Sequence, residues 1–368
     1  MDCFDGSGFQ VVQVAVRKKW EKEKMKILYL SCHAVLEYDE LKLLTEMGHD
    51  VFSIGAYSNP QQHGLARPNI PEMRYHADLH NIALQGGQEN IHPKLIEWAD
   101  VIISMHNARV RVEDHPQAWI ANNWERMRHK PVIWRSIGQS VQEVEESLRP
   151  FRDQGLRIVR YSPKETNIPG YVGGDTVIRF YKSEAEFKDW VGFKRQVITF
   201  TQSFSDRKDH LHYDLWMKVT EGFQRVVFGI GNEDLGDLWG GALPYEEMKK
   251  QFSENAVYMY TGTSPASYTL SFMEAWMSGI PVVAVGPKIA NKIYNMDTYE
   301  VSDLIRNGVD GFWSDDVNEL RGYIKKLIDD EHLAREIGQA GRQSAINHFG
   351  KFTIARQWQD YLSTIGKV

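Results

Sequence analysis

The feature that most constrains the fold is the stretch from Tyr260 to Pro287, which joins a turn, a short helix and a buried strand. A polar turn of small residues leads into SFMEAWMSG, a helix that Gly279 closes. The apolar run Val282–Val285 then follows Pro281. A short, continuous apolar run of this kind indicates a strand of a parallel sheet covered on both faces. The stretch therefore predicts an α/β protein.

The start of this helix is suited to bind an anion. The first backbone N–H groups of a helix have no partner within it, and together with the helix dipole they attract phosphate. Thr269, Leu270 and Ser271 lie where these donors are expected. Glu274, one turn further on, could accept hydrogen bonds from both hydroxyls of a ribose. The stretch could thus hold a nucleoside diphosphate from both ends.

A structural alternative exists for the same residues. Ser271 and Glu274 have the S-x-x-E spacing of a capping box, in which the glutamate only satisfies a backbone amide of its own helix. The motif by itself does not decide between a cap and a ligand site.

The segment SFMEAWMSGIPVVA resembles the (L)xEAMAxGxPVVA signature of GT-B glycosyltransferases, in particular the glycogen-synthase-like group that includes family 4. The resemblance implies an α/β fold of the GT-B type, with two Rossmann-like domains facing across a cleft. It also implies that Glu274 binds the ribose of a sugar-nucleotide donor. The family's first glutamate, eight residues earlier, is replaced here by Ala266.

The composition fits this expectation. The 368 residues are enough for two domains, and the net charge of −6 argues against a large nucleic-acid interface. Two cysteines and no apolar run of about 18 residues point to a cytoplasmic protein without a transmembrane helix.

The pattern of apolar runs predicts four parts. Residues 1–24 read as an N-terminal extension, 25–190 as a Rossmann-like acceptor domain, 191–350 as a Rossmann-like nucleotide-sugar domain, and 351–368 as a helix that packs back toward the first domain. Residues 57–92, rich in proline, glycine and polar residues, read as a long loop region.

Acceptor-side residues follow from the resemblance. His106 ends a predicted strand, as does the histidine that often lines the acceptor side in the family, and is a candidate catalytic residue; the alternative is a loop histidine without a role. A second family histidine falls on Ile137. That leaves Arg135, Ser136 and Gly138, with His33 in the first loop, as acceptor-side candidates.

Donor-side residues follow in the same way. The family's vGRlxxxKG segment supplies an arginine and a lysine that clamp the donor diphosphate. Here the arginine position is Gln202, Arg207 is near the lysine position, and Lys208 follows. Arg207 is thus expected to be both catalytic and donor-binding, with Lys208 beside it, although the pair could also be a solvated cluster at a helix start. Gly231 lies in a G-x-G that resembles the family's loop close to the donor.

The function implied is that of a glycosyltransferase, hexosyl or related, which uses a UDP-, GDP- or ADP-type sugar nucleotide and needs no metal or other cofactor. The acceptor could be a glycan, a lipid, a protein, a small molecule or a modified nucleic acid, and the sequence carries no signal for it or for the oligomeric state. Two alternatives stay open: a GT-B nucleotide-sugar epimerase, and a catalytically inactive GT-B scaffold that binds a partner. Replacements at three family positions favour the scaffold: Ala266, Gln202 and Ile137.

Overall fold

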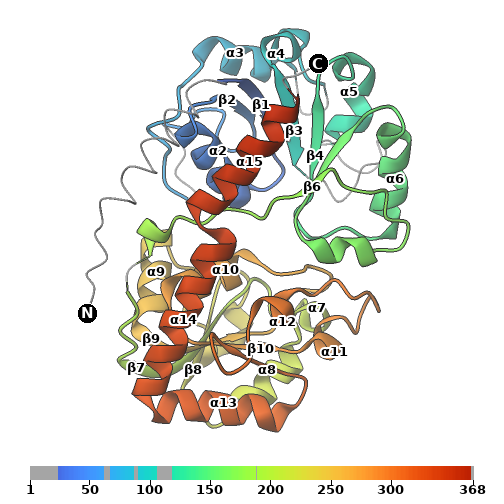
Figure 1. The fold of residues 1–368 in the computed structure, drawn as a ribbon. Coiled ribbons are helices and arrows are strands. Elements are labelled where there is room, and N and C mark those ends of the chain that lie inside the picture. Colours follow the sequence, from blue (N-terminus) through green and yellow to red (C-terminus); the bar gives the residue numbers. More distant parts are fainter. Residues whose placement is uncertain (1–23, 62–66, 87–89, 106–117, 188, 366–368) are drawn as a thin grey trace, which may run out of the picture.

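The computed structural model describes residues 24–61, 67–86, 90–105, 118–187 and 189–365. Two parallel sheets, each with helices packed around it, follow one another along the chain (Figure 1). The first sheet belongs to the blue-to-green part of the ribbon and the second to the yellow-to-orange part. The Rossmann-like pair predicted from the sequence is confirmed.

The first sheet has six parallel strands in the order β2-β1-β3-β4-β5-β6. Ile27 of β1, next to the edge strand, is in register with Val51 on one side and Val101 on the other. All three side chains are buried, as expected for strands that are covered on both faces. The strands are β1 (Lys26–Leu30), β2 (Asp50–Ile54), β3 (Val101–Met105), β4 (Val132–Arg135), β5 (Arg157–Arg160) and β6 (Thr176–Val177).

The helices of this domain connect successive strands. They are α2 (Ala34–Glu46), α3 (Ala77–Gly86), α4 (Pro93–Trp98), α5 (Trp119–Met127), α6 (Gln142–Arg152) and the 3-10 turn η1 (Pro163–Asn167). The prediction of a continuous loop over residues 57–92 was wrong in part, because α3 lies within it. Leu79, Ile82 and Ala83 of this helix have helical spacing but are only partly buried, and the proline, glycine and polar residues around them had indicated a loop.

The second sheet has five parallel strands in the order β11-β10-β9-β7-β8. They are β7 (Lys194–Phe200), β8 (Arg225–Phe228), β9 (Asn255–Tyr260), β10 (Val282–Val285) and β11 (Phe312–Ser314). The helices are α7 (Lys208–Leu211), α8 (Tyr213–Thr220), α9 (Tyr245–Glu254), α10 (Leu270–Ser278), α11 (Pro287–Ala290), α12 (Val301–Leu304), α13 (Val317–Asp329), α14 (Glu331–Phe349) and α15 (Lys351–Ile365), with 3-10 turns η2 (Glu184–Glu186) and η3 (Glu233–Leu238).

The end of α10 is fixed by close packing against α14. A Cβ atom added to Gly338 of α14 would lie 2.1 Å from the carbonyl oxygen of Gly279, which ends α10. Gly341, one turn along, faces the indole of Trp276 at a comparable spacing. Only glycine allows this contact, so α14 sets the position of the helix that carries Glu274.

The C-terminal helix α15 continues from α14 and lies against the first domain (Figure 1, red). Trp358 of α15 is fully buried, and its ring lies 5.7 Å from the guanidinium carbon of Arg135. The hydroxyl of Tyr361 donates to Asp175 over 3.3 Å. The last helix therefore ties the two sheets together. In the part of the chain that the structure describes, no helix has both the length and the apolar character needed to span a membrane.

Candidate functional site

The start of α10 has the geometry expected of an anion site. Thr269 is the N-cap, in an extended conformation, and its side chain makes no capping hydrogen bond. The first backbone bond of the helix runs from the amide of Met273 to the carbonyl of Thr269. The amides of Leu270, Ser271 and Phe272 therefore precede the first intrahelical bond. Thr269, Leu270 and Ser271 are half-buried, and the Thr269 and Ser271 hydroxyls lie 3.0 Å apart.

The capping-box interpretation of Ser271 and Glu274 is wrong. The helix begins at Leu270, so Ser271 is inside it and cannot be the N-cap. The Glu274 carboxylate points away from its own backbone, into an ion-pair network. Local spacing alone had suggested the box, because the sequence does not show the tertiary partners of the glutamate.

The carboxylate of Glu274 is buried between two cations. Its Oε1 accepts a hydrogen bond from Arg67 over 2.7 Å and another from Lys182 over 2.8 Å. Lys182 also donates to Asp39 of α2 over 2.7 Å. All four side chains are at most 8% exposed. Because Arg67 and Asp39 belong to the first domain and Glu274 to the second, the network spans both domains.

Charge compensation governs the protonation of this network. Burial raises the pKa of Asp39 to about 6, although Lys182 and Arg67 oppose the shift. Burial disfavours the charge of Arg67, but Glu274 and Asp39 outweigh it and raise the pKa of the guanidinium. His33, the N-cap of α2, is nearby: desolvation lowers its pKa, and the charges of Arg67 and Lys182 act in the same direction. His33 is therefore neutral at pH 7.

Arg67 also stacks on an aromatic ring. Its guanidinium carbon lies 4.1 Å from the ring centroid of Tyr245, the first residue of α9. The Tyr245 hydroxyl donates to Glu186 over 2.7 Å, which holds the ring in place. No local sequence signal marks this group of residues. Arg67 lies in the stretch taken for a loop, and Tyr245 belongs to no motif that the sequence resemblance covers.

The predicted donor-side cations are on the surface. Arg207 and Lys208 are exposed at the start of α7, in the segment that follows β7. Gly231, after β8, has φ 73°, and a Cβ atom there would lie 2.6 Å from the hydroxyl of Ser203. The amide of Ser203 donates to the carbonyl of Ile230, so the turns after β7 and β8 are joined. Both turns lie at the carboxyl end of the sheet, the end from which β9 leads toward α10.

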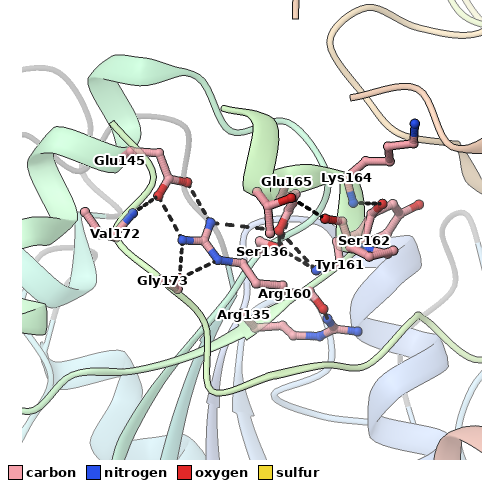
Figure 2. A network of polar contacts seen from close by, with 12 residues as sticks. Arg135, Ser136, Glu145, Arg160, Tyr161, Ser162, Lys164, Glu165, Val172 and Gly173 are labelled. Atoms are coloured by element: carbon pink, nitrogen blue, oxygen red, sulfur yellow. Dashed lines mark hydrogen bonds and ion pairs between the residues drawn. The ribbon is translucent and has the colours of Figure 1, made fainter. Parts of the chain in front are cut away.

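The predicted acceptor-side residues have a different setting (Figure 2). Arg135 is fully buried and donates to Glu40 over 2.7 Å. Ser136, also fully buried, lies 2.8 and 2.9 Å from the two oxygens of Glu165. Contact between an acceptor and either side chain would therefore need this part of the domain to open. His106 lies outside the described residues.

The carboxyl group of Glu165, which contacts Ser136, is buried. Burial raises the pKa of Glu165 to about 7, while Arg160 pulls it down. Arg160 is held mainly by Glu145, through two bonds of 2.6 and 2.8 Å, and is 3.9 Å from Glu165 (Figure 2). Gly138, with φ 77°, brings the backbone against the ring of Tyr161, since a Cβ atom there would lie 2.6 Å from it. The loop after β4 is thus closed over this cluster.

A second polar contact joins the domains. Glu300, just before α12, accepts a hydrogen bond from Ser162 over 2.5 Å and pairs with Arg179. Lys164 bridges to Asp297 and Asp303 over 3.1 and 3.0 Å. The segment after β5 is therefore held against the segment around α12.

Neither a protein-family model nor a curated protein sequence matches the chain. Solved structures do match over nearly the whole length. HepE from Anabaena, in complex with UDP-glucose, is 15% identical with a TM-score of 0.65, over 92% of this chain and all of that one. The chain has the GT-B fold.

Two further GT-B structures agree. Sucrose-phosphate synthase from Thermosynechococcus elongatus is 14% identical with a TM-score of 0.63, over 93% of this chain and 99% of that one. A glycosyltransferase from Rickettsia africae is 14% identical with a TM-score of 0.64, over 94% and 99%. The fold that the sequence resemblance implied is confirmed.

Proposed function

We propose that this GT-B chain is a glycosyltransferase that moves a hexosyl or related sugar from a nucleotide-diphosphate sugar to an acceptor. The observation that carries the proposal is the start of α10, with Thr269 making no side-chain cap and Glu274 one turn further on, directed at the first domain. An uncapped helix start attracts phosphate, and a carboxylate at this spacing can accept a ribose diol. The complex of HepE with UDP-glucose supports a sugar nucleotide as the ligand of this fold.

In the proposed reaction, the bond between the anomeric carbon and the terminal phosphate oxygen breaks. An acceptor oxygen takes the sugar and gives up its proton to a base, for which His106 remains the predicted candidate. The nucleoside diphosphate leaves with the bonding electron pair. The amides at Thr269–Ser271, together with Arg207 and Lys208, would stabilise the charge on the leaving diphosphate, so that no metal ion is required.

Binding and product analysis test the proposal together. We expect UDP, GDP or ADP to raise the melting temperature, and Glu274→Ala to weaken that nucleotide by roughly tenfold or more, because a charged hydrogen-bond partner of the ribose is lost. Glu336→Ala, on the exposed side of α14, is the control and should bind like the parent. A panel of sugar nucleotides with candidate acceptors should then release free nucleoside diphosphate. Indifference to all three nucleotides would contradict the proposal.

A binding scaffold without catalysis is the second candidate. The charge of Glu274 is already compensated by the buried cations of Arg67 and Lys182. The position of the family's first glutamate is occupied by Ala266, which is buried. Nucleotide binding without release of sugar from any donor would favour the scaffold. An epimerase would be recognised by an isomerised sugar that is still attached to its nucleotide.

A further inference from the structure

The group formed by Arg67, Tyr245 and Glu274 has the chemical layout of an occupied nucleoside site. The guanidinium of Arg67 is a planar, delocalised group, and it lies 4.1 Å from the ring centroid of Tyr245. The same group donates to the Glu274 carboxylate over 2.7 Å. A nucleoside presents the same two elements, a planar base that stacks on an aromatic ring and a diol that donates to a carboxylate.

We propose that Arg67 is an internal occupant of the nucleoside site and that Tyr245 is a base-stacking residue of that site. A nucleoside diphosphate binds by displacing the guanidinium from both Tyr245 and Glu274. This inference rests on the proposed function and adds to it one binding residue, Tyr245, and a competition between Arg67 and the ligand.

Other contacts of Lys182 keep this residue beside Glu274 when Arg67 moves. Lys182 is anchored twice apart from Glu274: its ammonium donates to Asp39, and its amide donates to the carbonyl of Phe349 at the end of α14. When Arg67 leaves, Lys182 still compensates Glu274. The site therefore keeps a buried cation next to the carboxylate while the ligand binds.

The ring of Tyr245 is prepared for a stacking partner. Its hydroxyl is fixed by Glu186, and Glu186 pairs in turn with Lys42 of α2. Tyr245 is 8% exposed, and its ring is covered by the Arg67 guanidinium and by the ammonium of Lys249, which lies 4.6 Å from the ring centroid. An aromatic ring held at its polar tip loses little freedom when a base replaces the guanidinium, which favours binding.

Competition predicts the sign of the effect of an Arg67 substitution. A ligand that must first displace an internal group binds with an affinity reduced by the fraction of molecules in which the site is vacant. Arg67→Ala is therefore expected to tighten the binding of UDP, GDP or ADP by roughly tenfold, whereas a residue that contacts the ligand would weaken binding when removed.

The test is titration calorimetry of the full chain with UDP, GDP and ADP, on the parent and on matched variants. Lys164→Ala is the control: it removes ion pairs to Asp297 and Asp303, which also join the domains, but leaves Glu274 untouched. Its affinity should stay within about twofold of the parent. Equal tightening in Lys164→Ala and Arg67→Ala would overturn the proposal, because loosening of the domains would then explain both.

Substitutions at Tyr245 test the stacking independently of Arg67. Tyr245→Phe keeps the ring and should bind the nucleotide nearly as the parent does, whereas Tyr245→Leu should weaken it by roughly tenfold, as for loss of one stacked base. Equal binding by the two variants would overturn the role of the ring. Unchanged or weaker binding in Arg67→Ala, with the parent binding a nucleotide, would overturn the competition and leave the proposed function standing. Absence of binding in every variant would overturn both.

Discussion

Tyr161 and Tyr268, one from each domain, stack with ring centroids 4.1 Å apart and exchange two hydrogen bonds. The hydroxyl of Tyr161 donates to the carbonyl of Tyr268 over 3.1 Å, and the hydroxyl of Tyr268 donates to the carbonyl of Tyr161 over 3.0 Å. Tyr161 follows β5, and Tyr268 directly precedes Thr269, the N-cap of α10. The contact between the domains is thus fixed beside the proposed phosphate site.

The reciprocal arrangement predicts similar costs for the two hydroxyls. Tyr161→Phe and Tyr268→Phe each remove one donor and leave a buried carbonyl without it, so each should lower the free energy of unfolding by ~1–2 kcal/mol. Tyr268→Ala also removes the stacked ring and should cost ~3–5 kcal/mol. Denaturant titration measures these values. Tyr294→Phe, at a 40% exposed tyrosine, is the control with an expected change below ~0.5 kcal/mol. If Tyr161→Phe and Tyr268→Phe were both as stable as the parent, the two hydrogen bonds would not stabilise the contact between the domains.

The contact of α10 with α14 gives a second prediction. Gly338→Ala places a Cβ atom 2.1 Å from a backbone oxygen, which cannot move away as a flexible side chain would. We expect a loss of ~1–3 kcal/mol and, because α10 must shift, weaker nucleotide binding. Gly322→Ala in α13 is the matched control, since nothing lies within 4 Å of its new methyl group and alanine favours a helix by ~0.5–1 kcal/mol. Thermal and denaturant unfolding would separate the two, and equal stability would refute the packing argument.

The buried Arg135 supplies a third prediction. Its guanidinium donates to Glu40 and lies 4.0 Å from the ring centroid of Phe180. Lysine offers neither the planar fork nor the same stacking, so Arg135→Lys should lower the free energy of unfolding by ~2–4 kcal/mol. Arg335→Lys, in an exposed pair with Glu331, should change it by less than ~0.5 kcal/mol. An Arg135→Lys protein of parental stability but altered acceptor use would contradict this structural role and support the acceptor-side role that the sequence resemblance implied.

Local sequence signals were sufficient for the framework. The predicted strand at Val282–Val285 has the observed bounds, because a continuous apolar run that follows Pro281 marks it. The signature around Glu274 located the helix and the strand β10 that follows it. Such features depend on neighbours within a few residues, which is the range over which a pattern is informative.

Partners of the site could not be found in this way. Arg67 and Glu274 are 207 positions apart, and no local period links them. Arg135 and Ser136 were placed by alignment to a motif, which gives a position along a strand but not whether the side chain faces the interior. Their burial follows from Glu40 and Glu165, whose carboxylates are supplied by other elements of the domain.

The pKa of Glu165 predicts how stability depends on pH. Burial raises this pKa from 4.5 in a solvated glutamate to about 7 in the folded protein, so the folded state holds a proton more tightly than the unfolded state. The resulting stabilisation is complete below about pH 4.5 and is lost as the pH rises toward 7, by ~2–3 kcal/mol. Asp39, with its pKa raised to about 6, acts with the same sign over a lower range.

Glu165→Gln should remove most of this dependence. Glutamine keeps an oxygen that can accept from Ser136 but carries no titratable proton, so its stability should change less between pH 5 and 7 than that of the parent. Denaturant midpoints at closely spaced pH values measure the slopes, and Glu336→Gln, at an exposed glutamate, should keep the parental slope. If Glu165→Gln kept that slope too, the carboxyl group at Ser136 would be ionised throughout the range, and Arg160 would have to compensate Glu165 as well as Glu145.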